Sequence, residues 1–467
     1  MENGESEEAD LLVVGGGATG LAGAWTGARA GKNVVLLEAG DRLGGSVRTH
    51  SEDGYVVEGG PHALLVQEPE LEEFLRDCGI ADSALEADPS AGKRFVVRNG
   101  KPVPLPSSPG GFLFGSFLPP WAKIRLLLEP FRHGKAPEGE EAIGPWVGRH
   151  FGNEARDALA DPFVSGIFAG DPDRISVQAA FPKLAEIAAL HPSLVRAFLR
   201  RARERRREGG RRPARRMISF PGGLGDLVGH LSRKGGFDVR PGSRLTRIER
   251  DAEGWRVRFR SGDDPETKHL RAARLLVCVP PHALPGLPFD DRISEVLAGF
   301  EAVESPPVTT FAVAYPRDRV AHPLDGYGVL APDREKRDVL GILFDGSLFP
   351  GRAPEGQVLV SAFLGGARHP ERARMDAETL LGTVGRECRE LLGAEGEPVY
   401  WKSTYWPRAI PQYDLGFRSI ADRLDGLEER NPGLAFAGNV RDGVSLGNCL
   451  LSGVRRTRGL LGIGQAA

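Results

Sequence analysis

Residues 11–20, LLVVGGGATG, join an apolar run directly to a glycine-rich turn. The apolar run predicts a buried parallel strand, and the residues after it predict a helix that begins at the turn. In such a turn Gly15 permits the tight bend, Gly17 lets the backbone approach a pyrophosphate, and Gly20 lets the helix pack closely on the strand. The N–H groups and the positive dipole end of the helix favour phosphate. The sequence therefore predicts an α/β fold with a phosphate-binding turn.

This glycine pattern is weak evidence when it stands alone, because a chain with 62 glycines contains chance matches and a tight turn needs no ligand. Here the sequence NVVLLE predicts a second buried strand, which ends at Glu38. An acidic side chain about 20 residues after the glycines accepts hydrogen bonds from a ribose diol. Strand, turn, helix, strand and carboxylate follow in order, which predicts dinucleotide binding.

The residues after Glu38 distinguish between two dinucleotide cofactors. The sequence AGDRLGGSVRTH places Arg42 beside the adjacent glycines Gly44 and Gly45. We interpret the glycine pair as a second close approach of the backbone to a pyrophosphate, which suits a deeply buried FAD and not a nicotinamide cofactor. Arginine alone is typical of a solvated surface, but the position of Arg42 favours a phosphate role. The FAD is predicted to be bound non-covalently.

Composition excludes several other functions. The formal net charge is −2, so no overall field draws the chain to nucleic acid. The four cysteines lack metal-ligand spacing, which predicts no metal site and a reducing, cytoplasmic compartment. The acidic start MENGESEEAD lacks the basic region of a secretory signal, and no apolar run reaches about 18 residues. We therefore expect neither export nor a segment that spans a bilayer.

Further elements follow the first βαβ unit. Residues 216–231 predict a strand or turn and a helix, 237–260 predict two antiparallel strands, and 272–284 predict a buried strand. Residues 431–461 predict a strand, a glycine turn and a last helix, while 286–424 predict a second sheet with helices on one side. We predict a discontinuous, Rossmann-like FAD-binding domain formed by residues 9–92, 216–285 and 425–467. A sheet-plus-helix substrate-binding domain is predicted to comprise residues 93–105 and 286–424. The third part is a helical insertion at residues 106–215.

Two segments of the insertion have open interpretations. Residues 112–128 hold several apolar side chains near Lys123 and Arg125, which favours an amphipathic membrane-surface patch and an ordinary helical core about equally. Residues 200–216 hold ten arginines. No aromatic residues interleave with them for base stacking, so we favour a solvated loop over nucleic-acid binding.

The glycine fingerprint, the acidic residue and the R-x-G-G pattern resemble the flavoproteins that include amine oxidases, phytoene desaturases and protoporphyrinogen oxidases. Four further blocks are similar to protoporphyrinogen oxidases in the same order and spacing, so the resemblance runs nearly end to end. They are PFVSGIFAGDPDRISVQAAFPKL (162–184), LGILFDGSLFPGRAPEG (340–356), YWPRAIPQYDLGF (405–417) and FAGNVRDGVSLGNC (436–449).

The resemblance implies a substrate site for a large, mostly apolar macrocycle with carboxylate arms. By its place in AGKRFVVRNG, Arg94 resembles the propionate-binding arginine of the family, which makes a bidentate contact. Leu330, Leu343 and Phe363 correspond to the apolar clamp, although from the sequence alone each is an ordinary strand core residue. Gly166 corresponds to a glycine where the backbone approaches the substrate.

The resemblance also implies the residues around the flavin. They are Gly15, Gly17, Gly20, Glu38, Arg42, Gly45, Gly60, Pro61, His62, Trp406, Gly438, Asn439 and Val444. His62 departs from the family, which often has Asn at this position. We do not assign His62 as a general base, because the family needs none. We expect His62 to contact the edge of the cofactor.

The resemblance implies oxidation of protoporphyrinogen IX to protoporphyrin IX for haem biosynthesis, with three hydride transfers and reoxidation by O2 to H2O2. No catalytic side chain is implied, because the flavin carries the chemistry in an apolar slot. Oxidation of coproporphyrinogen III to coproporphyrin III stays open as an alternative, and an amine oxidase or a non-catalytic flavin-binding scaffold is less favoured. A homodimer and peripheral contact with the inner face of the cell membrane are also left open.

Overall fold

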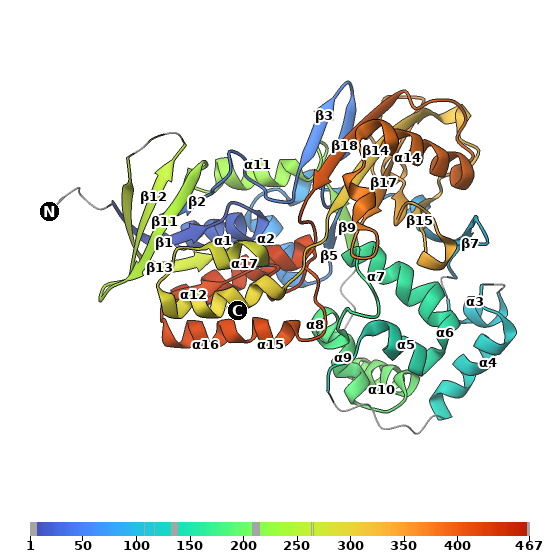
Figure 1. Cartoon of the computed structure of the whole chain (residues 1–467), viewed down its shortest axis with the longest axis horizontal. Coiled ribbons are helices and arrows are strands. Elements are labelled where there is room, and N and C mark those ends of the chain that lie inside the picture. The colour runs from blue at the N-terminus through green and yellow to red at the C-terminus, as the bar shows by residue number, and fades with distance from the viewer. Residues whose placement is uncertain are drawn as a thin grey trace.

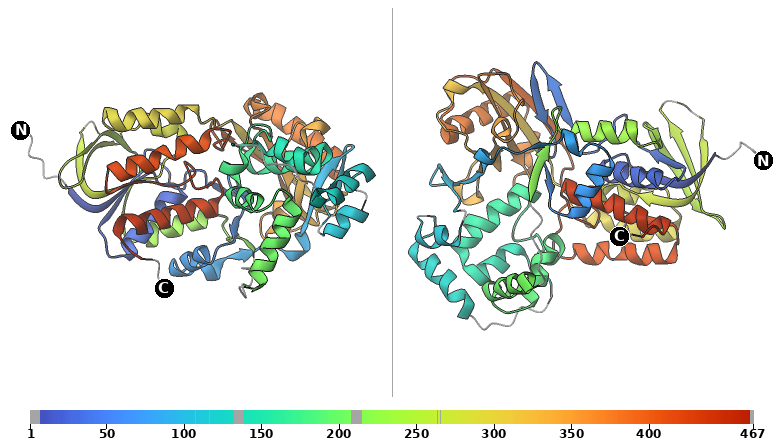
Figure 2. Two further views of the ribbon diagram at one scale, coloured as in Figure 1. Left: turned by 90° about the horizontal axis from the view of Figure 1, so that it is seen from below. Right: turned by 180° about the vertical axis from the view of Figure 1, so that it is seen from behind.

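The computed structural model describes residues 7–106, 108–115, 117–131, 139–207, 215–262, 264 and 266–464. One sheet with its helices occupies one end of an elongated molecule, and a second sheet and a group of helices occupy the other end (Figure 1). Both further views keep this division (Figure 2). The predicted α/β class is confirmed, whereas the domain boundaries stay a prediction.

The first sheet is parallel at its centre and has the strand order β10-β2-β1-β13, with β19 beside the second half of β13. An antiparallel pair, β11 and β12, continues from the first half of β13, which confirms the prediction for 237–260. The four residues before the glycine turn are buried, as the apolar run predicted. The strands are β1 (Glu7–Val14), β2 (Val34–Leu37), β10 (Asp238–Arg240), β11 (Ser243–Arg250), β12 (Trp255–Ser261), β13 (Lys268–Val277) and β19 (Leu434–Phe436).

Two helices, α1 (Ala18–Arg29) and α17 (Leu446–Leu461), lie against each other beside this sheet (Figure 1). The carboxyl ends of β1, β2, β13 and β19 meet at one edge, because the strands are parallel. In open α/β sheets the ligand binds at this edge. The helices α2 (Pro69–Asp77), α11 (Gly225–Lys234), α12 (Asp291–Ala298), α15 (Phe417–Ala421) and α16 (Arg423–Arg430) complete this end.

The second sheet has the strand order β18-β14-β17-β16-β15-β7-β8. One face forms a buried core with α14 (Ala377–Leu392), whose side chains Leu380, Val384 and Cys388 pack on it. This one-sided covering is the predicted sheet-plus-helix arrangement. The strands are β7 (Lys93–Arg98), β8 (Lys101–Pro104), β14 (Val308–Pro316), β15 (Gly326–Leu330), β16 (Gly341–Leu343), β17 (Gln357–Gly365) and β18 (Tyr400–Trp406).

Short elements lie between the two sheets. One is a hairpin of β3 (Thr49–Glu52) and β4 (Tyr55–Glu58). The other is a three-stranded sheet of β5 (Leu64–Val66), β6 (Leu85–Glu86) and β9 (Arg216–Ser219). The helix α13 (Asp345–Leu348) follows β16 directly. The remaining helices are α3 (Pro109–Phe114), α4 (Pro120–Leu128), α5 (Ile143–Phe151), α6 (Asn153–Ala155), α7 (Asp161–Phe168), α8 (Val177–Ala180), α9 (Pro182–Ala189) and α10 (Leu194–Arg207).

The arginine-rich segment corrects one expectation. Residues 200–207 are not a loop, because they form the second half of α10. Leu194 and Ala197 are buried at the start of this helix and anchor it, and arginine is a good helix former. Residues 208–214 of the segment lie outside the described residues, and Arg216 begins β9.

Candidate active site

The glycine turn lies at the carboxyl end of β1. Gly15 has φ +104°, and a Cβ there would lie 2.7 Å from the carbonyl oxygen of Cys278, so only glycine fits. A Cβ on Gly20 would lie 1.9 Å from the carbonyl oxygen of Gly15, which shows how closely α1 approaches the turn. Gly17 differs from both, because its backbone is extended and its Cβ would meet only the Cα of Gly45, at 3.9 Å. The position is therefore open on the side of the helix N-terminus.

The second glycine pair completes a cradle around Gly17. Gly44 forms a bridge with Gly17, and its N–H donates to the carbonyl oxygen of Gly16 over 2.8 Å. Gly45, with φ +58°, lies against Gly17. Two stretches of side-chain-free backbone thus meet at the first turn of α1, where N–H groups are free for an anion. This arrangement fits the pyrophosphate of FAD, and a side chain on Gly17 would fill it.

Glu38 and Arg42 hold this cradle in shape. The Glu38 carboxylate accepts hydrogen bonds from the N–H of Gly16 at 2.6 Å and of Gly40 at 2.8 Å. Arg42 donates to the carbonyl oxygens of Leu43, Gly45 and Val47. Burial and the charge of Arg48 lower the pKa of Arg42. The guanidinium therefore braces the glycine loop, and its contact with a phosphate stays a prediction.

Gly60 and Trp406 lead from the cradle toward the second sheet. A Cβ on Gly60 would lie 1.9 Å from the carbonyl oxygen of Ser46, so the segment after β4 passes directly over the glycine loop. The Trp406 indole N–H donates to the carbonyl oxygen of Gly59 over 2.6 Å. Trp406 ends β18, and this contact therefore ties the second sheet to the segment that holds Gly60, Pro61 and His62.

The turn between β19 and α17 lies at the same edge of the first sheet as the glycine turn after β1. Gly438 has φ +100°, and its Cβ would lie 2.8 Å from Thr19 Oγ1 on α1. The carbonyl oxygen of Asn439 accepts from the Tyr413 hydroxyl over 2.9 Å. Val444 immediately precedes Ser445, the N-cap of α17. All three predicted residues therefore lie on the loop that faces the first βαβ unit, and their contact with FAD stays a prediction.

The predicted substrate residues share one face of the second sheet. Strand pairing aligns Leu330, Gly341 and Phe363 in one row across β15, β16 and β17. The next row aligns Arg94 with Gly328 and Leu343. Side chains two residues apart on a strand point to the same face, so Arg94 and the three clamp residues lie on the side away from α14. The clamp side chains are only partly buried, whereas most side chains on the opposite face are buried.

Helix α7 approaches this face from the helical end. A Cβ on Gly166 would lie 2.9 Å from Leu330 Cδ2, so the predicted close-approach glycine touches the predicted clamp. Arg94 is exposed, and its guanidinium carbon lies 5.9 Å from the centre of the Tyr327 ring. The structure therefore brings the predicted substrate residues together around one surface.

The structure adds Asp345, which the sequence did not indicate, as the partner of His62. His62 Nδ1 and Asp345 Oδ1 are 2.6 Å apart, and both side chains are buried. The His62 ring also contacts the Phe363 ring edge to face, at 5.2 Å between centres. His62 thus joins the predicted flavin segment to the predicted clamp. In the sequence, only the position of Asp345, two residues after the predicted clamp residue Leu343, pointed to its place near the site.

Charged groups are buried behind this pair. Arg352 is 2% exposed, donates to Ser219 Oγ over 2.5 Å and lies 4.0 Å from Glu58 Oε1. Burial raises the pKa of Glu58, although its carboxylate accepts from Thr49 and from the N–H of Leu224. Burial and the charge of Asp345 raise the pKa of Tyr327. The region between the two sheets therefore buries several charged and polar side chains.

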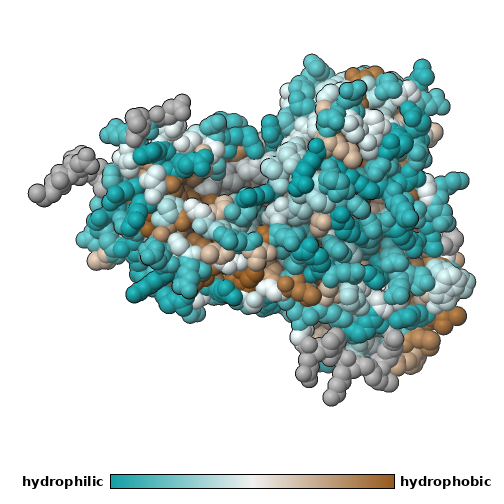
Figure 3. All heavy atoms as spheres, viewed as in Figure 1, coloured by the Kyte–Doolittle hydropathy of each residue, from teal (hydrophilic) through white to brown (hydrophobic). Residues whose placement is uncertain are grey.

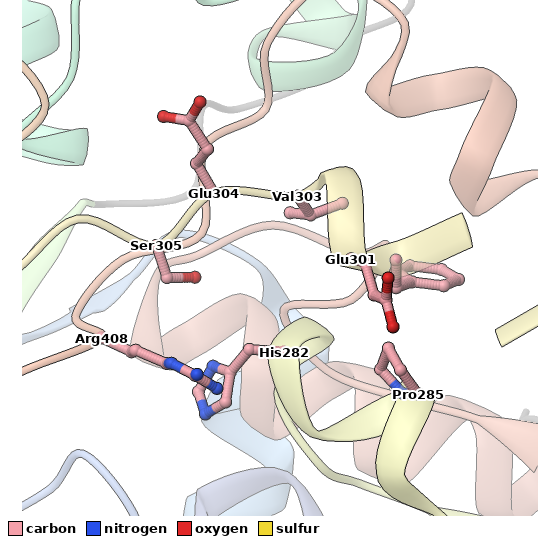
Figure 4. Close-up of a pocket in the computed structure, with 8 residues that line it drawn as sticks. His282, Pro285, Glu301, Val303, Glu304, Ser305 and Arg408 are labelled. Carbon is pink, nitrogen blue, oxygen red and sulfur yellow. The ribbon is translucent and has the colours of Figure 1, made fainter. Parts of the chain in front are cut away.

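A cavity of about 390 Å³ lies beside the carboxyl end of β13. The His282 and Arg408 side chains lie next to each other in its lining, Glu301 lies beside Pro285, and the Glu304 carboxylate points away from them (Figure 4). Burial and the charge of Arg408 lower the pKa of His282. The cavity carries both signs of charge, and we assign it no step. Among the described residues no group of three metal-ligating side chains is present.

The fold and this edge define an FAD-dependent oxidoreductase. The model of the family "Flavin containing amine oxidoreductase" matches residues 18–461. The chain belongs to this family, which confirms FAD as the cofactor and the resemblance to protoporphyrinogen oxidases and related flavoproteins.

Relatives extend over nearly the whole chain. The mitochondrial protoporphyrinogen oxidase of Nicotiana tabacum is 30% identical and covers 97% of this chain and 94% of its own length. The coproporphyrinogen III oxidase of Propionibacterium freudenreichii subsp. freudenreichii is 29% identical and covers 96% of this chain and 89% of its own length. A crystal structure from Exiguobacterium sp. 255-15 has a TM-score of 0.79 at 23% identity, covers 98% of this chain and 99% of its own, and shows a shared fold.

Proposed function

We propose that this protein oxidises protoporphyrinogen IX to protoporphyrin IX in three two-electron steps, with O2 as acceptor and H2O2 as product. The observation that carries the proposal is the single sheet face that gathers Arg94, Leu330, Leu343 and Phe363, which His62 joins to the segment over the glycine cradle. Full-length relatives that are protoporphyrinogen oxidases support it.

The chain's own residues would bind and orient the substrate. Leu330 and Phe363 offer a partly buried apolar surface for the macrocycle, and Gly166 allows α7 to approach it closely. Arg94, exposed at the same face, would hold a propionate arm by a charge-assisted contact. FAD, when bound, supplies the two-electron acceptor. The protein contributes position and exclusion of water, because catalysis depends on presenting each bridge of the macrocycle to the cofactor.

Oxidation of coproporphyrinogen III is the second candidate. A tetracarboxylate would use an additional cation, and Arg98 lies on the same face of β7 as Arg94. The Arg98 guanidinium carbon lies 5.7 Å from the centre of the Phe117 ring, and its Nη1 atom is buried without a partner among the described residues. A coproporphyrinogen III oxidase is also among the full-length relatives.

The test is an aerobic assay of the purified holoprotein with each porphyrinogen, in which porphyrin fluorescence and peroxide are measured together. We expect one H2O2 for each two electrons removed from the substrate. We also expect kcat/KM to be at least tenfold higher for protoporphyrinogen IX than for coproporphyrinogen III. A preference for coproporphyrinogen III would reverse the assignment of the two candidates. Failure of both substrates would remove porphyrinogen oxidation altogether.

Arg94→Ala is expected to raise KM about tenfold and to leave kcat within about twofold, because a distant propionate contact supplies ground-state binding. The measurement is steady-state kinetics on protoporphyrinogen IX. Lys93→Ala is the matched control, because Lys93 lies next on the same strand and pairs with Asp325. An unchanged KM in Arg94→Ala would remove this arginine from the substrate site.

We propose also that the helical end contacts a membrane surface. Apolar side chains around α3, α4 and the following turn are each more than half exposed: Phe114, Trp121, Ile124, Leu127, Leu128 and Phe131. Hydrophobic residues gather at the lower right of the molecule, near α4 (Figure 3). Phe117, Leu118 and Ala122 are buried beneath them, so the segment is both a core and a surface patch. Among the described residues no helix is long and apolar enough to cross a bilayer.

The double variant Ile124→Glu/Leu127→Glu is expected to lower the fraction bound to liposomes of mixed neutral and anionic lipid at least fivefold. The reason is that two exposed apolar side chains would no longer enter the acyl boundary. Cosedimentation measures the bound fraction. Val399→Glu is the control, because Val399 is equally exposed but lies before β18. Equal binding of the parent and the double variant would contradict the proposal.

A further inference from the structure

Helix α10 concentrates positive charge on one part of the surface. Its residues include seven arginines and one glutamate, whereas the whole chain has a formal net charge of −2. Arg196, Arg200 and Arg203 follow one another at spacings of four and three residues, so they lie along one face of the helix. All three side chains are exposed. The helix therefore presents a stripe of cations to its surroundings.

Bonding within the chain does not account for this stripe. The Glu204 carboxylate lies 3.1 Å from Arg200 and 3.6 Å from Arg201. Arg196 and Arg203 have no carboxylate partner among the residues that the structure describes. Exposed ion pairs within a helix contribute little to stability. The guanidinium groups are therefore available to an anionic partner.

Apolar side chains on the same helix indicate which anionic partner fits. Leu199 lies between Arg196 and Arg200 on the stripe and is 52% exposed, and Phe198 beside it is 47% exposed. Cations alone would suit any polyanion. Arginines that alternate with exposed apolar side chains on one helix are typical of a helix that lies in a membrane interface.

A second arginine-rich surface provides a comparison. Arg244, Arg258 and Arg260 are exposed on the antiparallel pair of β11 and β12, at the opposite end of the molecule from α10 (Figure 1). No large apolar side chain of these two strands is exposed. This surface has the charge of α10 without its apolar component, which makes it a matched control.

Helix α10 also continues the apolar surface around α4. The turn of residues 129–131, which follows α4, contacts α10. The Arg196 guanidinium carbon lies 6.0 Å from the centre of the exposed Phe131 ring. Buried Glu129 accepts a hydrogen bond from the N–H of Leu194, which fixes the start of α10 to this turn. The exposed apolar residues and the arginines therefore belong to one surface at the helical end.

We propose that α10 binds the phosphate headgroups of anionic phospholipids, while the apolar side chains around α4 enter the acyl boundary. This inference rests on the proposed membrane contact and names the lipid that the contact requires. Guanidinium groups present parallel N–H donors that match phosphate oxygens. Phe198 and Leu199 would lie between the headgroups. A bilayer that contains anionic lipid therefore binds the protein tightly, and a neutral bilayer binds it weakly.

The experiment is cosedimentation of the holoprotein with two kinds of vesicle, one of phosphatidylcholine and one of equal parts phosphatidylcholine and phosphatidylglycerol. The parent is expected to prefer the mixed vesicles about 100-fold at low salt, because each arginine near an anionic surface contributes about fivefold. Arg196→Gln/Arg200→Gln/Arg203→Gln is expected to bind the mixed vesicles about 100-fold more weakly and phosphatidylcholine as the parent does. Glutamine is a helix former similar to arginine, so α10 is expected to persist in the circular dichroism.

Two further variants separate location from charge. Arg244→Gln/Arg258→Gln/Arg260→Gln removes the same charge at the other end of the molecule and is expected to bind both kinds of vesicle as the parent does. Arg196→Lys/Arg200→Lys/Arg203→Lys keeps the charge of α10 and is expected to bind the mixed vesicles within about threefold of the parent. Added NaCl is expected to weaken the parent's binding to mixed vesicles more than that of the glutamine variant of α10.

Equal affinity of the parent for the two kinds of vesicle would overturn the inference and leave the membrane contact in place. Equal losses in the two glutamine variants would also overturn it, because total charge would then be the cause. A labelled single-stranded RNA that displaces the parent from mixed vesicles, but does not bind the glutamine variant of α10, would make α10 a nucleic-acid site instead. Absence of binding to either kind of vesicle would refute the membrane contact itself, and the two failures are thereby distinguished.

Discussion

Gly17→Val is expected to give a colourless protein that folds. Its Cβ would meet no protein atom closer than 3.9 Å, and the backbone at Gly17 is extended, which Val adopts readily. The side chain would instead occupy the cradle between Gly17 and Gly45, where we expect the pyrophosphate. We expect FAD affinity to fall at least 100-fold, with the far-ultraviolet circular dichroism unchanged. Flavin absorbance per protein, before and after reconstitution with FAD, measures the effect.

Gly459→Ala is the matched control for this substitution. Gly459 lies in α17, and a Cβ there would have no atom within 4 Å. Alanine favours a helix interior over glycine by about 0.5–1 kcal/mol, so this variant is expected to keep its FAD and to be slightly more stable. Normal flavin content in Gly17→Val would show that the cofactor does not lie over this turn.

Glu129→Gln is expected to lower the free energy of unfolding by about 3 kcal/mol. The reason is that four buried hydrogen-bond donors would lose their charged acceptor. Glu129 is fully buried and accepts from His150, from the Ser193 hydroxyl and from the N–H groups of Leu194 and Val195. These bonds attach the start of α10 to the turn after α4. Thermal unfolding of the variant and parent measures the loss.

The loss depends on pH with a definite sign. Burial acts to raise the pKa of Glu129, but the hydrogen bonds from Ser193, Leu194 and Val195 outweigh it and hold the pKa below its ordinary value. The contribution is therefore complete above the unfolded pKa of about 4.3 and is lost as pH falls through the folded pKa. The difference in Tm between parent and Glu129→Gln should stay constant from neutral pH to about 5 and shrink below it. Glu429→Gln, at an exposed site on α16, should show no such difference. A difference that grows toward acid pH would contradict this account.

The local part of the fold could be predicted from the sequence. The turn at Gly15, the strand that ends at Glu38 and the antiparallel pair β11–β12 each depend on residues that are close together in the chain. Their patterns are strong because strand burial, glycine geometry and turn chemistry agree at each position. The arginine-rich segment shows the opposite case. Its charge suggested a loop, whereas helix propensity and the buried Leu194 favour α10.

The substrate face depends on pairing between distant strands, and periodicity does not report such pairing. Arg94 and Leu343 share a row only because β7 joins β15 in parallel and β16 in turn pairs with β15. Family resemblance named these residues, but their shared orientation required the structure. His62 and Asp345 lie 283 residues apart, and neither has a local signature of a paired side chain. The bonds from Arg42 to the carbonyl oxygens of Gly45 and Val47 could not be predicted from the sequence either, because the shape of the glycine loop determines them.

Anaerobic addition of protoporphyrinogen IX to the purified yellow holoprotein tests the central claim most directly. If FAD lies over the glycine cradle with a porphyrinogen on the adjacent face, the flavin absorbance bleaches while porphyrin fluorescence rises, and admission of air restores the yellow colour. Persistent flavin absorbance with protoporphyrinogen IX and with coproporphyrinogen III, in a sample whose FAD is still bleached by dithionite, would contradict the claim.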